Sequence, residues 1–125
     1  MNQTVVVVED DKPIRDMYAW KLKAEGFNVF SAENGQVGMS VIEKVRPDLI
    51  LLDIRMPVMS GDDMLEKLRG TDWGSSIRVI ILTNLSKDEA PHKLRFFNVD
   101  RYIVKAHSTP AQVLSTINEL LGIKN

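Results

Sequence analysis

The chain has 125 residues and a net charge of −1, with 16 Lys or Arg against 17 Asp or Glu, so its length fits one domain and its charge argues against nucleic-acid binding. The absence of cysteine excludes disulfides, zinc–thiolate sites, iron–sulfur clusters and thiol catalysis. No apolar run approaches the roughly 18 residues of a membrane span, and the N-terminus lacks the features of a signal peptide. We therefore expect a soluble, cytoplasmic single domain over residues 1–125, with no output domain and no membrane association.

Five short segments are predicted to be strands. Three of them are continuous apolar runs rich in β-branched residues, which are typical of strands covered on both faces of a parallel sheet. The segment Phe27–Ala32 has mixed polarity and predicts an edge strand, and the short Tyr102–Val104 also fits an edge. The three buried runs are Val5–Val8, Leu49–Leu52 and Val79–Leu82.

Apolar residues at helical spacing separate these strands. A first helix is predicted from Asp11 or Lys12 to Glu25, with Pro13 in its first turn. The last helix begins after Thr109 as N-cap and stops near Gly122. Two further helices are predicted over Asn34–Val45 and Ser60–Leu68.

The helix before the fifth strand is harder to place. Ser86 and Glu89 have the spacing of a capping box, but a helix that began there would put Pro91 beyond its first four positions. Asp88 as N-cap keeps the proline within the first turn. We therefore predict a short helix over about Glu89–Phe97.

Strand and helix patterns alternate from one end of the chain to the other. This alternation predicts an α/β three-layer sandwich, a flavodoxin-like (βα)5 fold. Right-handed crossovers, together with edge positions for the second and fifth strands, favour a parallel sheet of order 2-1-3-4-5. In such a sheet the functional crevice lies beyond the carboxyl ends of the strands, here between the first and third.

Polar residues follow the predicted strands at that edge. Glu9 and Asp10 follow the first strand, Asp53 the third, Thr83 the fourth and Lys105 the fifth. Carboxylates gathered at one site repel each other unless a cation lies among them. An all-oxygen ligand set favours a hard ion, with Mg²⁺ preferred over Ca²⁺ because the set is small and lacks an EF-hand loop.

The same residues suit phosphoryl transfer. The Asp53 carboxylate, fixed at the end of a buried strand, can attack a phosphoryl group if the charge on the transferring oxygens is neutralised. A divalent ion would neutralise it from one side and the Lys105 ammonium from another. The Thr83 hydroxyl would add a hydrogen bond.

Four motifs carry a family resemblance that covers essentially the whole chain: VVVEDD, DLILLDIRMPVMSG, VIILTN and YIVK. Together they resemble the receiver domain of two-component response regulators. The resemblance implies that Asp53 accepts a phosphoryl group from a histidine kinase or His-phosphotransfer protein. It also implies that Mg²⁺ is held by Glu9, Asp10, Asp53 and the backbone carbonyl of Arg55. Such a protein is a signalling switch that catalyses only its own phosphoryl transfer and dephosphorylation.

The resemblance also implies how the signal leaves the site. Lys105 pairs with the phosphate, Thr83 turns towards it, and Tyr102 changes between outward and buried rotamers. A downstream protein then binds the face formed by the Glu89–Phe97 helix, the fifth strand and the last helix. Homodimerisation is a further option, and no direct contact with nucleic acid is implied.

Two departures from the family pattern leave an alternative open. The usual Pro after the lysine is replaced by Ala106, where a cis bond would cost about 2.5–4 kcal/mol, so either the bond is trans or the strain is offset. Asn84 follows Thr83, where a very small residue is usual. The alternative is a degenerate receiver that docks partners without phosphorylation, although the retained acids, Thr83 and Lys105 disfavour it.

Enzymes and cofactor carriers of similar architecture are excluded. A flavodoxin needs a phosphate-cradling loop after the first strand, where the sequence EDDKP would repel phosphate. The dinucleotide fingerprint G-x-G-x-x-G is missing. A haloacid-dehalogenase-type phosphatase needs an Asp two residues after its nucleophile, where this chain has Arg55 after Asp53 and Lys12 after Asp10.

Overall fold

Five strands pair into one parallel sheet in the computed structural model, which describes residues 2–123. Their order, β2-β1-β3-β4-β5, confirms the predicted topology, with both expected edge strands at the edges. Because every neighbouring pair is parallel, all five carboxyl ends lie at the same edge of the sheet. The strands are β1 (Thr4–Val8), β2 (Asn28–Ala32), β3 (Leu49–Leu52), β4 (Arg78–Thr83) and β5 (Arg101–Val104).

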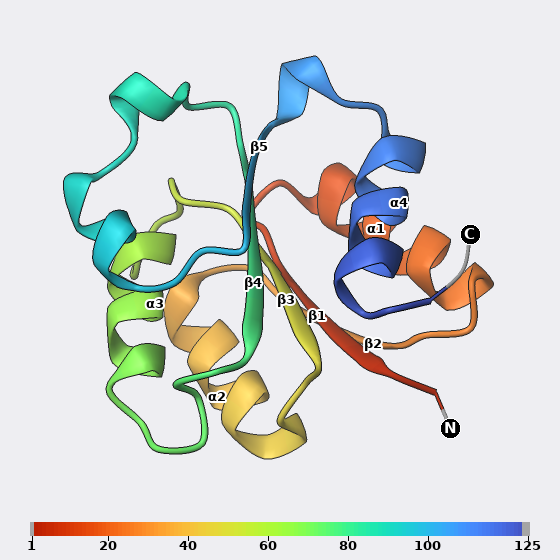
Figure 1. Cartoon of the computed structure of the whole chain (residues 1–125), viewed down its shortest axis with the longest axis horizontal. Coiled ribbons are helices and arrows are strands. Elements are labelled where there is room, and N and C mark those ends of the chain that lie inside the picture. Colours follow the sequence, from red (N-terminus) through yellow and green to blue (C-terminus); the bar gives the residue numbers. More distant parts are fainter. Residues whose placement is uncertain (1, 124–125) are drawn as a thin grey trace.

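Helices cover both faces of this sheet (Figure 1). On one face lie α1 (Lys12–Ala24) and α4 (Pro110–Leu120), and on the other lie α2 (Gly35–Val45) and α3 (Gly61–Arg69). Each helix begins after a capping side chain that accepts a hydrogen bond from a backbone N–H three residues later. These caps are Asp11, Asn34, Ser60 and, as predicted, Thr109.

The central strands are buried on both sides, which explains their continuous apolar runs. In β1, Val5 and Val7 pack under α1 and α4, whereas Val6 and Val8 pack under α2 and α3. All four valines are at most 1% exposed. The two apolar layers hold the carboxyl edge of the sheet in a fixed geometry.

The predicted helix over Glu89–Phe97 is wrong. The described chain forms no α-helix between β4 and β5; two short 3₁₀-helices, η1 (Lys87–Glu89) and η2 (His92–Phe96), take its place. Leu94 of η2 is buried and belongs to the core layer under α2 and α3. The connection from β4 to β5 is therefore an irregular strap, made of η1 and η2, that packs on the core layer under α2 and α3.

A cap and a proline explain this difference. The Ser86 side chain accepts from the Glu89 backbone N–H, and the Glu89 carboxylate accepts from the Ser86 backbone N–H, so the capping box is present and Ser86, not Asp88, is the N-cap. Pro91 restricts the residue before it to an extended conformation, and Ala90 has ψ 144°. The turn that Ser86 begins is therefore interrupted before an α-helix can form.

Two basic side chains attach this strap to α3. Lys93 of η2 forms ion pairs with three acidic residues of α3: Asp62, Asp63 and Glu66. The Arg69 guanidinium, at the end of α3, donates to four backbone carbonyls at 2.7–2.9 Å. Those carbonyls belong to Gly74, Ile77, Phe97 and Asn98, so one side chain joins the loop after α3 to the end of the strap.

Replacing Arg69 should therefore destabilise the fold. We expect Arg69→Met to lower the free energy of unfolding by about 2–4 kcal/mol, since it leaves several partly buried carbonyls without a donor. Urea unfolding measures the loss. Lys67→Met, on the exposed side of the same helix, is the control and should change stability by less than about 0.5 kcal/mol. Equal losses in the two variants would contradict the anchoring role.

Candidate functional site

Three carboxylates meet where β1 and β3 end. Val8 is in register with Leu52, so the residues that follow them, Glu9 and Asp53, leave neighbouring strands side by side. Oxygens of Glu9, Asp10 and Asp53 all lie within 4.8 Å of one another. The structure thus brings together the acidic residues that the sequence analysis selected.

Lys105 reaches this cluster from the far side of β4. Its Nζ lies 2.5 Å from Glu9 Oε1 and 3.0 Å from Asp53 Oδ2. The other carboxylate oxygens accept backbone hydrogen bonds: Asp53 Oδ1 from Ile54 N at 2.7 Å, and Glu9 Oε2 from Asp11 N at 3.2 Å. One ammonium therefore links the ends of β1, β3 and β5.

The protonation of this cluster is set by burial and by mutual charge. Glu9 is only 4% exposed, and its burial, with the negative charge of Asp53 adding to it, raises the pKa of Glu9 to about 7 despite its bond to Lys105. Burial alone would lower the pKa of Lys105, but its bonds to Glu9 and Asp53 outweigh burial and raise that pKa. Lys105 therefore stays charged at neutral pH, whereas the Glu9 carboxyl changes its protonation near neutral pH.

The donor set fits a hard divalent cation. When ionised, three carboxylates and one ammonium leave two negative charges, which a divalent ion would balance. All the donors are oxygens, as Mg²⁺ prefers, and Asp10 is exposed to solvent. Asp10 and Arg55 also line one groove of about 520 Å³ beside the cluster. Glu9, Asp10 and Asp53 are therefore the residues that could hold Mg²⁺.

Gly61 fixes the loop between Asp53 and α3. A Cβ atom at this position would lie 1.9 Å from the Asp53 carbonyl oxygen, so no larger residue fits without moving the backbone. The Gly61 N–H also donates to the Ile54 carbonyl at 2.8 Å. This close approach holds the start of α3 against the segment that carries Asp53.

Thr83 and Tyr102 converge on the loop after β4. Thr83 is 2% exposed, and its hydroxyl accepts from the Leu85 N–H at 3.4 Å. The Tyr102 hydroxyl donates to the Leu85 carbonyl at 2.9 Å and to the Ser86 carbonyl at 3.3 Å. Both side chains therefore contact the same loop, and Tyr102 has its inward orientation.

The two departures from the family pattern have simple structural outcomes. Within residues 2–123 no peptide bond is cis, so Lys105 and Ala106 are joined by a trans bond and the ammonium still reaches the cluster. Asn84 is exposed, whereas the side chain of Leu85 is buried.

Arg15 is a contributor that the sequence analysis missed. Its Nη1 donates to the Glu9 carbonyl at 2.7 Å and to the Asp10 carbonyl at 3.4 Å, which braces the turn between β1 and α1. A signal was present, because a cation near a helix N-terminus is unfavourable for the helix dipole unless something else binds it.

Comparison with known proteins identifies the class. A model of the family described as the response regulator receiver domain matches residues 5–118. The phosphate regulon transcriptional regulatory protein PhoB of Pseudomonas aeruginosa is 34% identical over 123 residues, which cover 97% of this chain and 52% of that protein. Sporulation initiation phosphotransferase F of Bacillus subtilis is 37% identical over 83 residues, 66% of this chain and 65% of that protein.

Solved structures of response regulator receivers have the same fold as this chain. A CheY-like response regulator receiver domain protein from Methanospirillum hungatei superposes with a TM-score of 0.86 at 29% identity, covering 98% of this chain and 95% of that one. The chemotaxis protein CheY4 of Vibrio cholerae gives 0.87 at 25% identity, covering 95% and 98%. The chain belongs to the receiver domains of two-component response regulators, which are signalling switches.

Two further facts concern the length of the relatives and the helices of this chain. The chain spans about half the length of curated relatives such as PhoB, of which it covers 52%. None of the helices that the structure describes is long and apolar enough to cross a membrane.

The raised pKa of Glu9 predicts a pH effect on stability. Between its ordinary value of 4.5 and about 7, the unfolded chain releases the Glu9 proton more readily than the folded one, so the metal-free protein loses stability as pH rises through this range. Relative to Glu9→Gln, which cannot ionise, the wild type should lose on the order of 3 kcal/mol between about pH 4.5 and 8.

Urea unfolding at several pH values, with a metal chelator present, measures this difference. Glu43→Gln, at an exposed position of α2, is the control and should follow the wild type. A constant difference between the wild type and Glu9→Gln over the whole range would contradict the buried environment of this carboxyl.

Proposed function

We propose that Asp53 accepts a phosphoryl group from the phosphohistidine of a histidine kinase or His-phosphotransfer protein. A carboxylate oxygen of Asp53 forms a bond to phosphorus, the phosphorus–nitrogen bond of the donor breaks, and the donor imidazole keeps the electron pair and takes up a proton. The proposal rests chiefly on one observation: the Lys105 ammonium lies against Asp53 and Glu9 together, where a transferred phosphoryl group would carry its charge.

The chain's own residues have separate roles in this step. Lys105 neutralises charge on the phosphoryl oxygens, and the hydrogen bond from Ile54 N fixes the carboxylate that attacks. The Thr83 hydroxyl only accepts in its described hydrogen bond, so its proton is free for a phosphoryl oxygen. Glu9, Asp10, Asp53 and the backbone carbonyl of Arg55 would hold Mg²⁺. When bound, the ion supplies positive charge to the transferring oxygens.

The same hydroxyl groups suggest how phosphorylation changes the surface. When Thr83 turns towards the phosphoryl group it gives up its bond to the Leu85 N–H, and the Leu85 carbonyl is an acceptor for Tyr102. The loop and the tyrosine therefore rearrange together. The surface that changes is formed by the strap of η1 and η2, β5 and α4, where a downstream protein binds. We place the protein in the cytoplasm, with residues 1–125 acting as one receiver unit.

Phosphorylation can be tested by mass spectrometry of the intact chain after incubation with acetyl phosphate and Mg²⁺. We expect one phosphoryl adduct on the wild type and none on Asp53→Asn, because the amide cannot act as the nucleophile. Asp72→Asn, at an exposed position in the loop after α3, is the matched control and should keep the adduct. Failure of the wild type with both acetyl phosphate and phosphorylated kinase would instead support a docking module that works without phosphorylation.

The switch has a separate test in Thr83→Val, which keeps the side-chain shape and removes the hydroxyl. We expect this variant to form the phosphoryl adduct while losing the response of the surface, because nothing then moves the 84–86 loop. Amide NMR shifts of residues 84–90 and 102, recorded before and after addition of Mg²⁺ and beryllium fluoride, measure that response. Shift changes equal to those of the wild type would rule out a role for Thr83 in transmission.

A further inference from the structure

One residue holds the turn that carries Asp10. Three consecutive carbonyls of the turn between β1 and α1 accept hydrogen bonds from Arg15. Its Nη1 donates to the carbonyls of Glu9 and Asp10, at 2.7 and 3.4 Å, and its backbone N–H donates to the Asp11 carbonyl at 2.9 Å. Because Arg15 is the fourth residue of α1, its side chain folds back over the residues that precede the helix. Arg15 therefore fixes the main chain at Asp10.

Asp10 differs from the other two acidic residues in what holds its carboxylate. The carboxylates of Glu9 and Asp53 each contact Lys105, and each also accepts a hydrogen bond from a backbone N–H. The Asp10 carboxylate is exposed and has no hydrogen bond or ion pair within residues 2–123. It nevertheless reaches to within 4.8 Å of the other two. Its position is therefore set by its main chain rather than by contacts of its own.

We propose that Arg15 is a positioning residue for Mg²⁺, because by holding the carbonyls of Glu9 and Asp10 it orients the Asp10 carboxylate towards the cation. This inference rests on the proposed function, in which Glu9, Asp10 and Asp53 are ligands of the ion. A ligand whose direction is fixed before the ion binds loses less conformational freedom on binding, so the affinity is higher. Arg15 touches neither the ion nor the phosphoryl group and acts through Asp10.

The charge of Arg15 alone would have the opposite effect. A guanidinium near a divalent cation repels it, so a purely electrostatic role predicts that removal of this charge strengthens Mg²⁺ binding. A positioning role predicts that the same removal weakens binding. A role confined to fold stability would leave the Mg²⁺ affinity of the folded protein unchanged. The direction of the change in affinity therefore separates the three roles.

Titration of the full chain with Mg²⁺ at fixed ionic strength, followed by amide NMR, measures this affinity. We expect Arg15→Met to weaken Mg²⁺ binding by roughly tenfold. Arg15→Gln, whose amide is too short to reach the turn, is a second variant and should show the same loss. Circular dichroism checks that each variant is folded.

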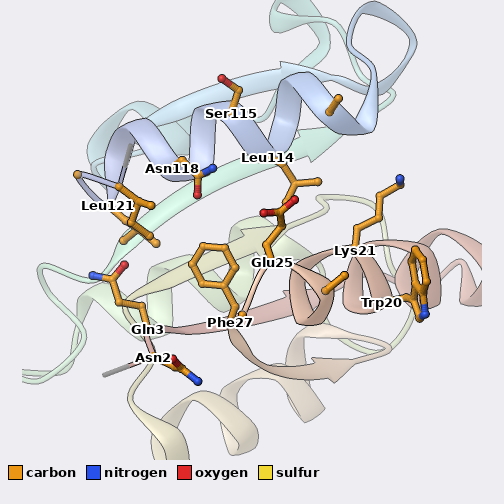
Figure 2. Close-up of a pocket in the computed structure, with 15 residues that line it drawn as sticks. Asn2, Gln3, Trp20, Lys21, Glu25, Phe27, Leu114, Ser115, Asn118 and Leu121 are labelled. Atoms are coloured by element: carbon orange, nitrogen blue, oxygen red, sulfur yellow. The ribbon is translucent and has the colours of Figure 1, made fainter. Parts of the chain in front are cut away.

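Two other cations of α1 provide matched controls. Lys12 lies at the same end of the helix but pairs with the exposed Asp16, so Lys12→Met removes a nearby charge and leaves the turn intact. Its Mg²⁺ affinity should equal that of the wild type or exceed it by up to about threefold. Lys21 lies six residues beyond Arg15, beside the groove between α1 and α4 (Figure 2). Lys21→Met should leave the affinity unchanged.

A double-mutant cycle shows whether Arg15 acts through Asp10. Asp10→Asn alone should weaken Mg²⁺ binding by roughly tenfold or more, because it removes a charged ligand. In that background Arg15→Met should cost less than about twofold, since no carboxylate is left to orient.

Unchanged or tighter Mg²⁺ binding by Arg15→Met would overturn the positioning role while leaving the proposed phosphoryl site intact. An equal loss with and without the Asp10 carboxylate would also overturn it, because Arg15 would then act on the site as a whole. If the wild type does not bind Mg²⁺, the metal site of the proposed function is wrong, and the role of Arg15 is wrong with it.

Discussion

The Lys105 ammonium is the contact on which the site depends. Lys105 follows β5, and its ammonium contacts Glu9, which follows β1, and Asp53, which follows β3. The contact therefore joins three places that are far apart in the sequence. Without it, two nearly buried carboxylates would face each other, and an unpaired buried charge typically costs about 3–5 kcal/mol. The same ammonium marks the position where charge would develop during phosphoryl transfer. The contact that stabilises the resting site is therefore also suited to its chemistry.

This arrangement requires both a rigid part and a movable part. The parallel sheet gathers the functional residues at one edge, and core layers on both faces hold Glu9 and Asp53 in place. By contrast, the hydrogen bonds that hold the loop after β4 come from two hydroxyl groups: Tyr102 donates to the Leu85 and Ser86 carbonyls, and Thr83 accepts from the Leu85 N–H. The strap that follows it is short and non-α-helical, yet its far end is fixed to α3 by Lys93 and Arg69. A change at Thr83 would therefore act mainly on the near end of the strap.

Sequence patterns were sufficient for most of this architecture, and the reasons are physical. A continuous apolar run such as Val5–Val8 indicates a strand covered on both faces, and parallel pairing then places the residues after each strand at one edge. This reasoning predicts from the sequence alone that Glu9, Asp10 and Asp53 lie close together, as they do in the structure. The predicted helix over Glu89–Phe97 is wrong because the capping box at Ser86 begins a turn earlier in the chain, and Pro91 interrupts that turn before an α-helix can form.

The partners of individual long side chains were not readable in advance, although the position of Arg15 near a helix N-terminus indicated that something binds it. Arg15 and Arg69 act on backbone carbonyls, and which carbonyls a long flexible side chain reaches depends on the folded chain rather than on spacing. The inward orientation of Tyr102 also depends on where the loop after β4 places the Leu85 carbonyl. The gathering of charged residues at strand ends was predictable, whereas the contacts that long side chains make across the fold were not.

The most direct test of the central claim is thermal unfolding with Mg²⁺ and beryllium fluoride, an analogue of the bound phosphoryl group. If Asp53, the acidic pair and Lys105 form one phosphoryl site, the two ligands together should raise the melting temperature by roughly 5–10 °C, because both bind only the folded protein. Each ligand alone should have a much smaller effect, and Lys105→Met should lose most of the joint increase. No joint increase in the wild type, or an equal increase in Lys105→Met, would contradict the account.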